Sequence, residues 1–66
     1  MSAEEMRNFC QSIRPFDLRV QVRLKDRSET FFGKIINVER ERFELETDDK
    51  VMKSVRFAWV ARIANA

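Results

Sequence analysis

The side chains in this chain that are suited to chemistry are almost all arginines, lysines and carboxylates. There are 13 lysines and arginines and 11 aspartates and glutamates, but no histidine. The lone cysteine, Cys10, therefore has no histidine to activate its thiol, and the commonest general base and metal ligand are both missing. A single glycine, Gly33, excludes a glycine-rich phosphate loop. We predict that the chain is not an enzyme and holds no metal or cofactor.

The charges are unevenly distributed along the chain. Residues 14–34 carry six basic and three acidic side chains, whereas residues 39–50 carry three basic and six acidic ones. The last segment, residues 51–66, is basic again through Lys53, Arg56 and Arg62. A basic face attracts phosphates. The simpler alternative is that these charges are the solvated sides of amphipathic strands.

An N-terminal helix is predicted over residues 3–13. Ser2 and Glu5 have the spacing of a capping box, and Pro15 disfavours helix at the residue before it. One apolar stripe follows at helical spacing, formed by Met6, Phe9, Cys10 and Ile13. A helix this short must dock on the rest of the fold, so we expect its stripe to cover an open end of a sheet, with Cys10 as a packing residue.

Short strands fill the remainder of the chain. Residues 17–25 alternate strictly, with Leu18, Val20, Val22 and Leu24 on one side and basic or polar residues on the other. Asp26-Arg27-Ser28 is predicted to be a turn. Four more strands are expected over residues 29–39, 43–47, 51–57 and 60–63, separated by the charged loop 39–42, the acidic turn 48–50 and a brief turn at Ala58-Trp59.

Gly33 is the residue around which we expect the strands to be organised. It lies in an apolar run, Phe31 to Val38, where a glycine marks a bend, a bulge or the close approach of another backbone. A strongly bent strand lets a short sheet curl into a small barrel. The predicted fold is therefore mainly β: one domain over residues 1–66, with the helix at about 3–13 and a five-stranded antiparallel barrel at about 17–64. Gly33→Val is expected to unfold the protein or block assembly.

Size and composition add three expectations. A core of 66 residues is small, which favours oligomerisation. With one cysteine no internal disulfide can form, which fits a reducing, cytoplasmic setting. The apolar runs are too short to span a membrane, and the acidic start of the chain lacks a secretory signal region.

With these elements in place, the chain resembles the Sm-like family, which includes the Sm and LSm proteins and bacterial Hfq. The resemblance covers about residues 18–63. Its first part consists of Val20-Gln21-Val22-Arg23-Leu24-Lys25-Asp26, then Phe31-x-Gly33-x-Ile35-x-x-Val38-Glu39 and Phe43-x-Leu45. The second part is Val55-Arg56 followed by Val60 and Ile63. The chain departs from the family where the uridine-contacting asparagine falls at Glu44 and where Arg-Gly becomes Arg56-Phe57. Other small barrels of the SH3 type share much of this pattern.

The resemblance implies a homo-oligomeric ring of about five to seven subunits in which the fourth strand of one subunit pairs with the fifth strand of the next. Candidate interface residues are Met52, Phe57, Trp59 and Ile36, because these apolar residues exceed what a small core can hold. For Trp59, a place in the core or at its rim is an equal alternative.

The resemblance also implies RNA contacts from Arg42, Glu44 and Arg56, with a solvated, salt-bridged loop as the alternative for Arg42 and Glu44. A separate basic and aromatic face, made of Phe32, Arg19 and Arg23, suits single-stranded RNA. Two functions therefore stay open. One is a ring-forming protein that binds single-stranded RNA, and the other is a non-enzymatic protein-interaction or assembly module with no RNA role.

Overall fold

The structure is a computed structural model that describes residues 2–26 and 29–66. Helix α1 (Ala3–Ile13) and a 3-10 turn, Arg14–Phe16, precede five strands. These are β1 (Arg19–Leu24), β2 (Thr30–Val38), β3 (Arg42–Thr47), β4 (Met52–Arg56) and β5 (Val60–Asn65). A second 3-10 turn, Phe57–Trp59, joins β4 to β5. The predicted turn at 26–28 falls largely outside the described residues, because Arg27 and Ser28 are not among them.

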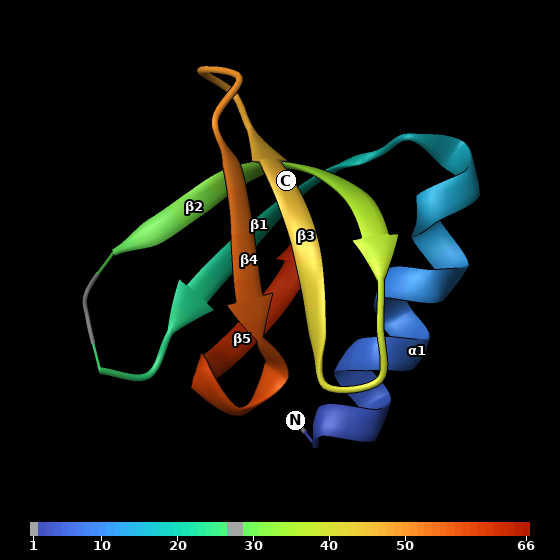
Figure 1. The fold of residues 1–66 in the computed structure, drawn as a ribbon, viewed down its shortest axis with the longest axis vertical. Helices are drawn as coiled ribbons and strands as arrows, with labels where there is room; N and C mark the ends of the chain where they lie inside the picture. The colour runs from blue at the N-terminus through green and yellow to red at the C-terminus, as the bar shows by residue number, and fades with distance from the viewer. Residues whose placement is uncertain (1, 27–28) are drawn as a thin grey trace.

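The strands form one antiparallel sheet in the order β4-β3-β2-β1-β5. Figure 1 shows β2 curving strongly across the molecule, so that the sheet wraps around the core. The helix followed by a bent five-stranded antiparallel sheet confirms the predicted fold class. Closure into a barrel is not confirmed, because β4 and β5 are the two ends of the sheet order and do not pair with each other.

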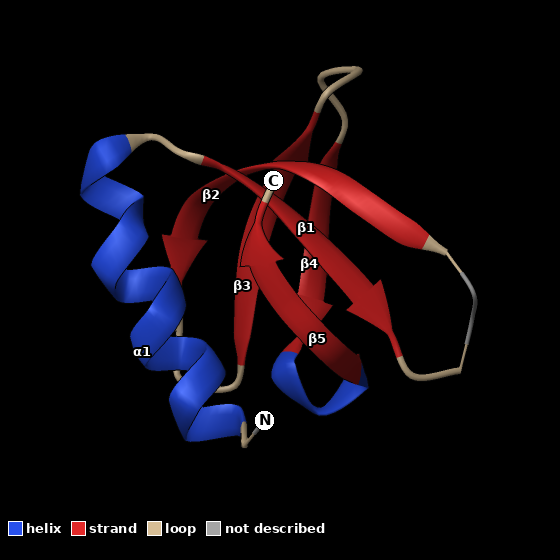
Figure 2. Ribbon diagram, turned by 180° about the vertical axis from the view of Figure 1, so that it is seen from behind, coloured by secondary structure: helices blue, strands red, loops and turns tan. Residues whose placement is uncertain are grey.

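Helix α1 is capped and docked as its sequence predicts. The Glu5 backbone N–H donates to Ser2 Oγ, and the Ser2 N–H donates to the Glu5 carboxylate, both at 3.1 Å. Hydrogen bonding to the Glu5 carboxylate from the Ser2 backbone, and secondly from the Ser2 side chain, lowers the pKa of Glu5. Met6, Cys10 and Ile13 are buried in the core, and the helix lies along one side of the sheet (Figure 2). Cys10 is completely buried, as expected of a packing residue.

Gly33 lies where two backbones come close together. It faces Thr47 in the register of β2 with β3. A Cβ atom built on it would lie 2.1 Å from the Glu46 carbonyl oxygen and 2.8 Å from Thr47 Cα. The φ angle of Gly33 is not positive, so the glycine is required by space rather than by backbone conformation.

A register shift between Ile35 and Asn37 marks a β-bulge in β2. The bulge explains why strict alternation breaks down after Gly33. Val38 packs against the core as predicted, and Ile36 is left 39% exposed on the outer side.

The core corrects three sequence expectations. Phe57, proposed for an interface, is 1% exposed, and its ring centroid lies 5.2 Å from that of Phe43. The 3-10 turn that begins at Phe57 directs this side chain inward. Leu18 and Val51 were each expected inside a strand, in the predicted ranges 17–25 and 51–57. They lie just outside β1 and β4 and are 46% and 45% exposed, so neither continues the buried side of its strand.

Candidate functional site

Two arginines predicted to contact RNA come from different strands and lie opposite each other. The register of β3 with β4 pairs Arg42 with Arg56. The loop of residues 39–41 leads into β3, and a hydrogen bond from the Glu39 N–H to the Arg42 carbonyl closes it at 2.8 Å. A second hydrogen bond, from the Phe57 N–H to the Glu41 carbonyl at 3.0 Å, connects this loop to the β4–β5 turn. The two segments that carry the predicted RNA contacts therefore adjoin.

A cavity of about 260 Å³ lies at this point, lined by Glu39, Arg40, Glu41, Arg42 and Arg56. Arg42 Nε donates to the Glu39 carboxylate at 3.1 Å, so one of the two arginines already has an acidic partner. Within the described residues Arg56 makes no ion pair. Glu44 is next along the same side of β3, half-buried and opposite Ser54.

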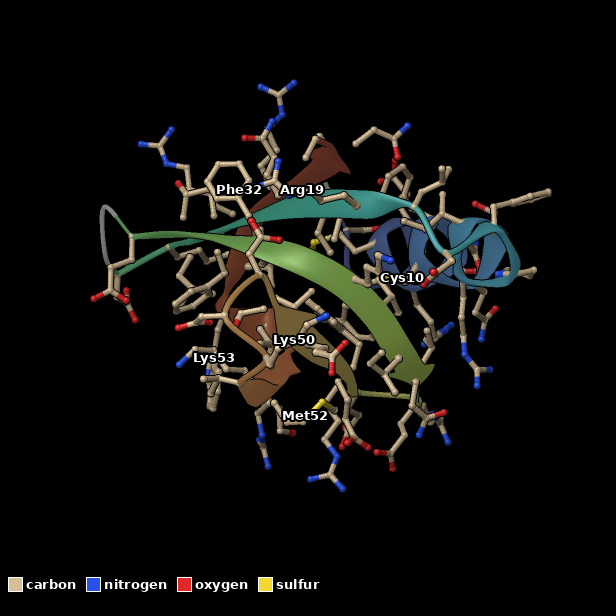
Figure 3. The ribbon with its side chains drawn as sticks, turned by 90° about the horizontal axis from the view of Figure 1, so that it is seen from above. Cys10, Arg19, Phe32, Lys50, Met52 and Lys53 are labelled. Carbon is tan, nitrogen blue, oxygen red and sulfur yellow. The ribbon has the colours of Figure 1, made fainter. Side chains whose placement is uncertain are left out.

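A second group of predicted residues lies on the outer face of the sheet. The Arg19 guanidinium binds the Asp48 carboxylate through Nε and Nη2, and its Cζ lies 4.8 Å from the centroid of the Phe32 ring. Figure 3 shows Arg19 and Phe32 side by side on this face. The hydrogen bonds raise the pKa of Arg19 and lower that of Asp48. Sequence reasoning missed Asp48, because it lies 29 positions from Arg19.

Arg23, the third residue predicted for this face, is exposed and sits opposite Thr30 on β2. On its other side it faces Arg62 of β5. Arg62 was not among the predicted site residues. Its only signal in the sequence is its basic character in the last strand, since the register that places it beside Arg23 cannot be read from the sequence.

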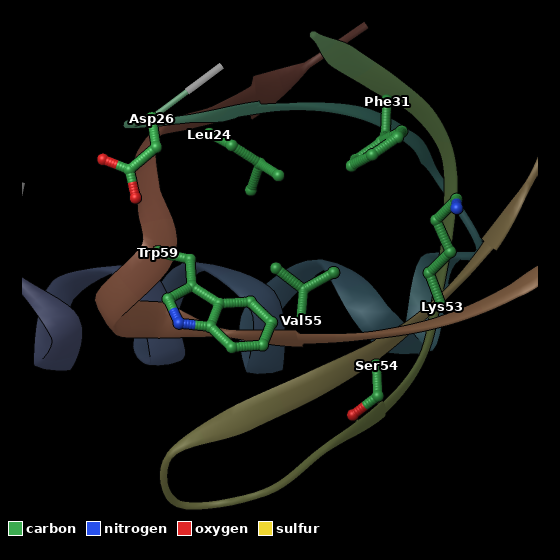
Figure 4. Close-up of a pocket in the computed structure, with 7 residues that line it drawn as sticks. All are labelled: Leu24, Asp26, Phe31, Lys53, Ser54, Val55 and Trp59. Carbon is green, nitrogen blue, oxygen red and sulfur yellow. The ribbon is translucent and has the colours of Figure 1, made fainter.

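The unpaired edge of β4 borders a second cavity, of about 400 Å³ (Figure 4). Its apolar wall is formed by Leu24, Phe31, Val55 and Trp59, and Asp26, Lys53 and Ser54 complete it. Lys53 Nζ lies 4.9 Å from the centroid of the Phe31 ring. The Lys25 N–H donates to the Trp59 carbonyl at 2.8 Å, which fixes the turn that carries the indole.

Of the four predicted interface residues, two are exposed next to the edge. Met52 is 49% exposed and Trp59 50% exposed. Ile36 is exposed too, but it belongs to β2, which lies inside the sheet, and its carbonyl accepts a bond from Arg14 Nε at 2.9 Å. Met52 therefore lies at the start of the edge strand and Trp59 in the turn that follows its end, whereas Ile36 lies on an inner strand.

Among the residues the structure describes, no group of three or more histidine, cysteine, aspartate or glutamate side chains is arranged to hold a metal. No helix in this part of the chain is long and apolar enough to cross a membrane. Comparison of the sequence with known protein families found no matching family model. Comparison with curated proteins found no match.

Proposed function

We propose that this protein assembles head to tail into a closed oligomer and binds single-stranded RNA on that assembly. The observation that carries the proposal is the sheet order, which leaves β4 and β5 as two unpaired edges of one sheet. A contact between unlike edges closes into a ring when the rotation between subunits permits it. The resemblance to Sm-like proteins implies the same contact.

The hydrogen bonds identify which backbone groups each edge offers. In antiparallel pairs, alternate residues bond to the neighbouring strand and the others point away from it. The Thr47 N–H bonds to the Val51 carbonyl, and the Phe57 N–H bonds to the Glu41 carbonyl. In β4, the backbone N–H and C=O groups of residues 53 and 55 therefore bond to β3. The backbone groups of residues 52, 54 and 56 point away from β3, toward the open edge. In β5, the hydrogen bond from the Ala66 N–H to the Arg19 carbonyl shows that residue 66 bonds to β1. By the same alternation, the backbone N–H and C=O groups of Ile63 and Asn65 point toward the open edge.

Charge disfavours a symmetric contact between two β5 edges. Glu44 and Glu46 lie on the outer side of β3, one strand in from the β4 edge, whereas Arg23 and Arg62 flank the β5 edge. A contact between two β5 edges would bring Arg62 of each copy toward the other, and like charges opposite each other destabilise a sheet. A head-to-tail contact avoids opposing two copies of Arg62. The junction itself stays basic, because β4 carries Lys53 and Arg56, with Glu44 and Glu46 one strand further in.

Apolar burial supports the same contact. Met52, on β4, and Trp59, in the turn after β4, are half exposed, and Trp59 belongs to the apolar wall of the 400 Å³ cavity. A strand added to β4 covers these side chains while its backbone completes the ladder. For a 66-residue core this burial adds stability that the monomer lacks.

RNA binding is supported by the opposed Arg42 and Arg56 beside the 260 Å³ cavity. Guanidinium groups bind phosphate in a bidentate way and stack on unpaired bases, so this pair suits a single strand. Because Glu39 already neutralises Arg42, Arg56 supplies most of the attraction for phosphate.

Assembly is tested by the mass in solution of Ser54→Pro, measured by light scattering after size-exclusion chromatography. Proline removes an N–H that points away from β3, so it blocks a neighbouring strand without breaking the β3–β4 ladder. We expect several subunits for the native chain and for the control Ser54→Ala, and a monomer for Ser54→Pro. A native chain that is monomeric refutes the assembly.

RNA binding is tested by titrating labelled hexanucleotides of uridine or adenosine over a salt series. Arg56→Gln should weaken binding and reduce the slope of log K against log salt by about 0.7 for each phosphate that the variant no longer neutralises. Lys50→Gln removes the same charge from the β3–β4 turn and serves as the control. If Arg56→Gln binds as tightly as Lys50→Gln, Arg56 is not part of an RNA site.

The 400 Å³ cavity beside the β4 edge favours one second candidate, an interaction module that captures an extended peptide of another protein. Such a peptide would add a strand to β4 and place an apolar side chain between Trp59 and Phe31. A monomeric native chain that binds no RNA but loses a peptide ligand on Trp59→Ala would favour this module over the ring.

A further inference from the structure

The outer face of β1 arranges its residues in rows that cross the sheet. In one row Arg23 lies between Thr30 of β2 and Arg62 of β5. In the next row Gln21 lies opposite Phe32. Rows on one side of a strand are two residues apart, which is about 7 Å.

Arg23 and Arg62 are a second pair of directly opposed arginines, besides Arg42 and Arg56. Both are exposed, they are direct partners in the register of β1 with β5, and within the described residues neither makes an ion pair. Directly opposed residues have Cβ atoms about 5 Å apart, and like charges at that distance destabilise a sheet. An anion between the two guanidinium groups removes this repulsion and accepts hydrogen bonds from both.

Arg19, two rows from Arg23 on the same side of β1, is in the opposite condition. Its edge is bound to Asp48 and one face lies over the Phe32 ring, so its charge is balanced and its plane is held in place. Asp48 is itself fixed, because its N–H donates to the Phe32 carbonyl at 3.0 Å. The remaining face of the Arg19 guanidinium is a flat surface, and guanidinium planes stack on unpaired bases.

We propose that these two groups form one nucleotide-binding site on the outer face of the sheet, in which Arg23 and Arg62 hold a phosphate and the Arg19–Phe32 stack holds a base. The inference rests on the proposed RNA-binding function and adds Arg62 to it as a phosphate ligand. The division of roles follows from the charges, since the unpaired arginines attract an anion and the neutralised one offers only stacking.

The class of ligand follows from these two roles, phosphate binding by Arg23 and Arg62 and base stacking on Arg19. A base inside a duplex is already stacked and cannot reach the Arg19 plane, so the site takes a single strand. The Gln21 carboxamide, next to Phe32, is both a donor and an acceptor, so it can bind the edge of any base. The site therefore binds single-stranded RNA with little preference among bases.

The two roles are separated by comparing a uridine hexanucleotide with an abasic chain of the same length, which keeps the phosphates and lacks the bases. Arg62→Gln should weaken both ligands by roughly threefold to tenfold and lower the salt slope by about 0.7. Phe32→Leu should weaken only the ligand with bases, by roughly fivefold or more. Lys50→Gln is the matched charge control, and circular dichroism checks that each variant is folded.

The proposal is overturned if Arg62→Gln and Arg23→Gln bind no more weakly than Lys50→Gln, or if Phe32→Leu weakens the abasic chain as much as the uridine chain. Loss of binding in Arg56→Gln together with unchanged binding in the outer-face variants overturns this site alone and leaves the proposed function intact. A native chain that binds neither ligand overturns both.

Discussion

Replacing Gly33 by alanine is the smallest change that tests how this sheet is built. The added Cβ would lie 2.1 Å from the Glu46 carbonyl oxygen, whereas ordinary van der Waals contact begins at 3.4 Å. The atoms it meets belong to the backbone of β3, so rotation of a side chain cannot relieve the clash, and β2 and β3 must move apart. Overpacking of this kind costs about 1–3 kcal/mol, and each ladder hydrogen bond that breaks adds about 1 kcal/mol.

The expected loss of stability for Gly33→Ala is therefore about 3 kcal/mol or more. A chain of 66 residues has a free energy of unfolding of about 3–10 kcal/mol in total, so the variant loses a large part of it. Its melting temperature should fall by more than about 10 °C. Urea unfolding followed by the fluorescence of Trp59, the only tryptophan, and by circular dichroism measures the loss.

Ala61→Val is the control, because it adds two methyl groups to an exposed position of β5 and should change the free energy of unfolding by less than about 0.5 kcal/mol. Gly33→Val should be at least as damaging as Gly33→Ala. An alanine variant with the native urea midpoint would show that β2 and β3 do not approach as closely as described, and the account of Gly33 would be wrong.

Three further changes test other parts of the fold. Lys50 has a φ of 68°, so Lys50→Gly should raise the melting temperature by relieving up to about 1 kcal/mol of backbone strain. Burial raises the pKa of the Cys10 thiol to about 12, from an ordinary value of 9.0. Stability should therefore fall as the pH rises from 9 toward 12, because only the unfolded chain ionises there, and Cys10→Ala should remove that slope from pH-dependent urea unfolding. Asp48→Asn should tighten RNA binding because it leaves the positive charge of Arg19 without its carboxylate partner, and Glu46→Gln, which removes the same charge, controls for net charge in the same titration.

The parts of the fold that repeat along the sequence were predictable. The helical stripe of Met6, Cys10 and Ile13 and the alternation of Val20 and Val22 each place apolar side chains on one side, and burial of that side decides the structure. The burial of these residues could be predicted without knowing which residues they contact. The same reasoning failed at Leu18, because alternation does not show where a strand begins.

The parts that depend on partners distant in the sequence were not predictable. Phe57 looked like surplus apolar surface, since nothing in its neighbours shows that a 3-10 turn will bring it against Phe43. Asp48 reaches Arg19 only because a bond between its N–H and the Phe32 carbonyl extends the contact of β2 with β3. A closed barrel would need β4 to pair with β5 of the same chain. The number of predicted strands does not show whether those two strands meet.

Assembly and RNA binding should be coupled, because both arginine pairs lie on the outer face of the sheet and near opposite edges. Arg42 and Arg56 lie at the β4 edge, and Arg62 lies at the β5 edge beside Arg23. If β4 of one copy pairs with β5 of the next, these groups join one continuous basic surface, and bound phosphates screen the repulsion between them. Bound RNA then strengthens the association of subunits, and association strengthens RNA binding by the same factor.

The coupling predicts that a uridine oligomer long enough to cross two subunits raises the mass measured by light scattering at dilute protein, whereas a hexanucleotide raises it less. It also predicts that Ser54→Pro, which blocks the β4 edge, binds the long oligomer more weakly than Ser54→Ala does. Equal affinity in these two variants would mean that each copy binds RNA alone. A surface that is continuous across subunits would gain affinity from every subunit it adds. Equal affinity would therefore mean that the two arginine pairs act as separate sites on one small sheet.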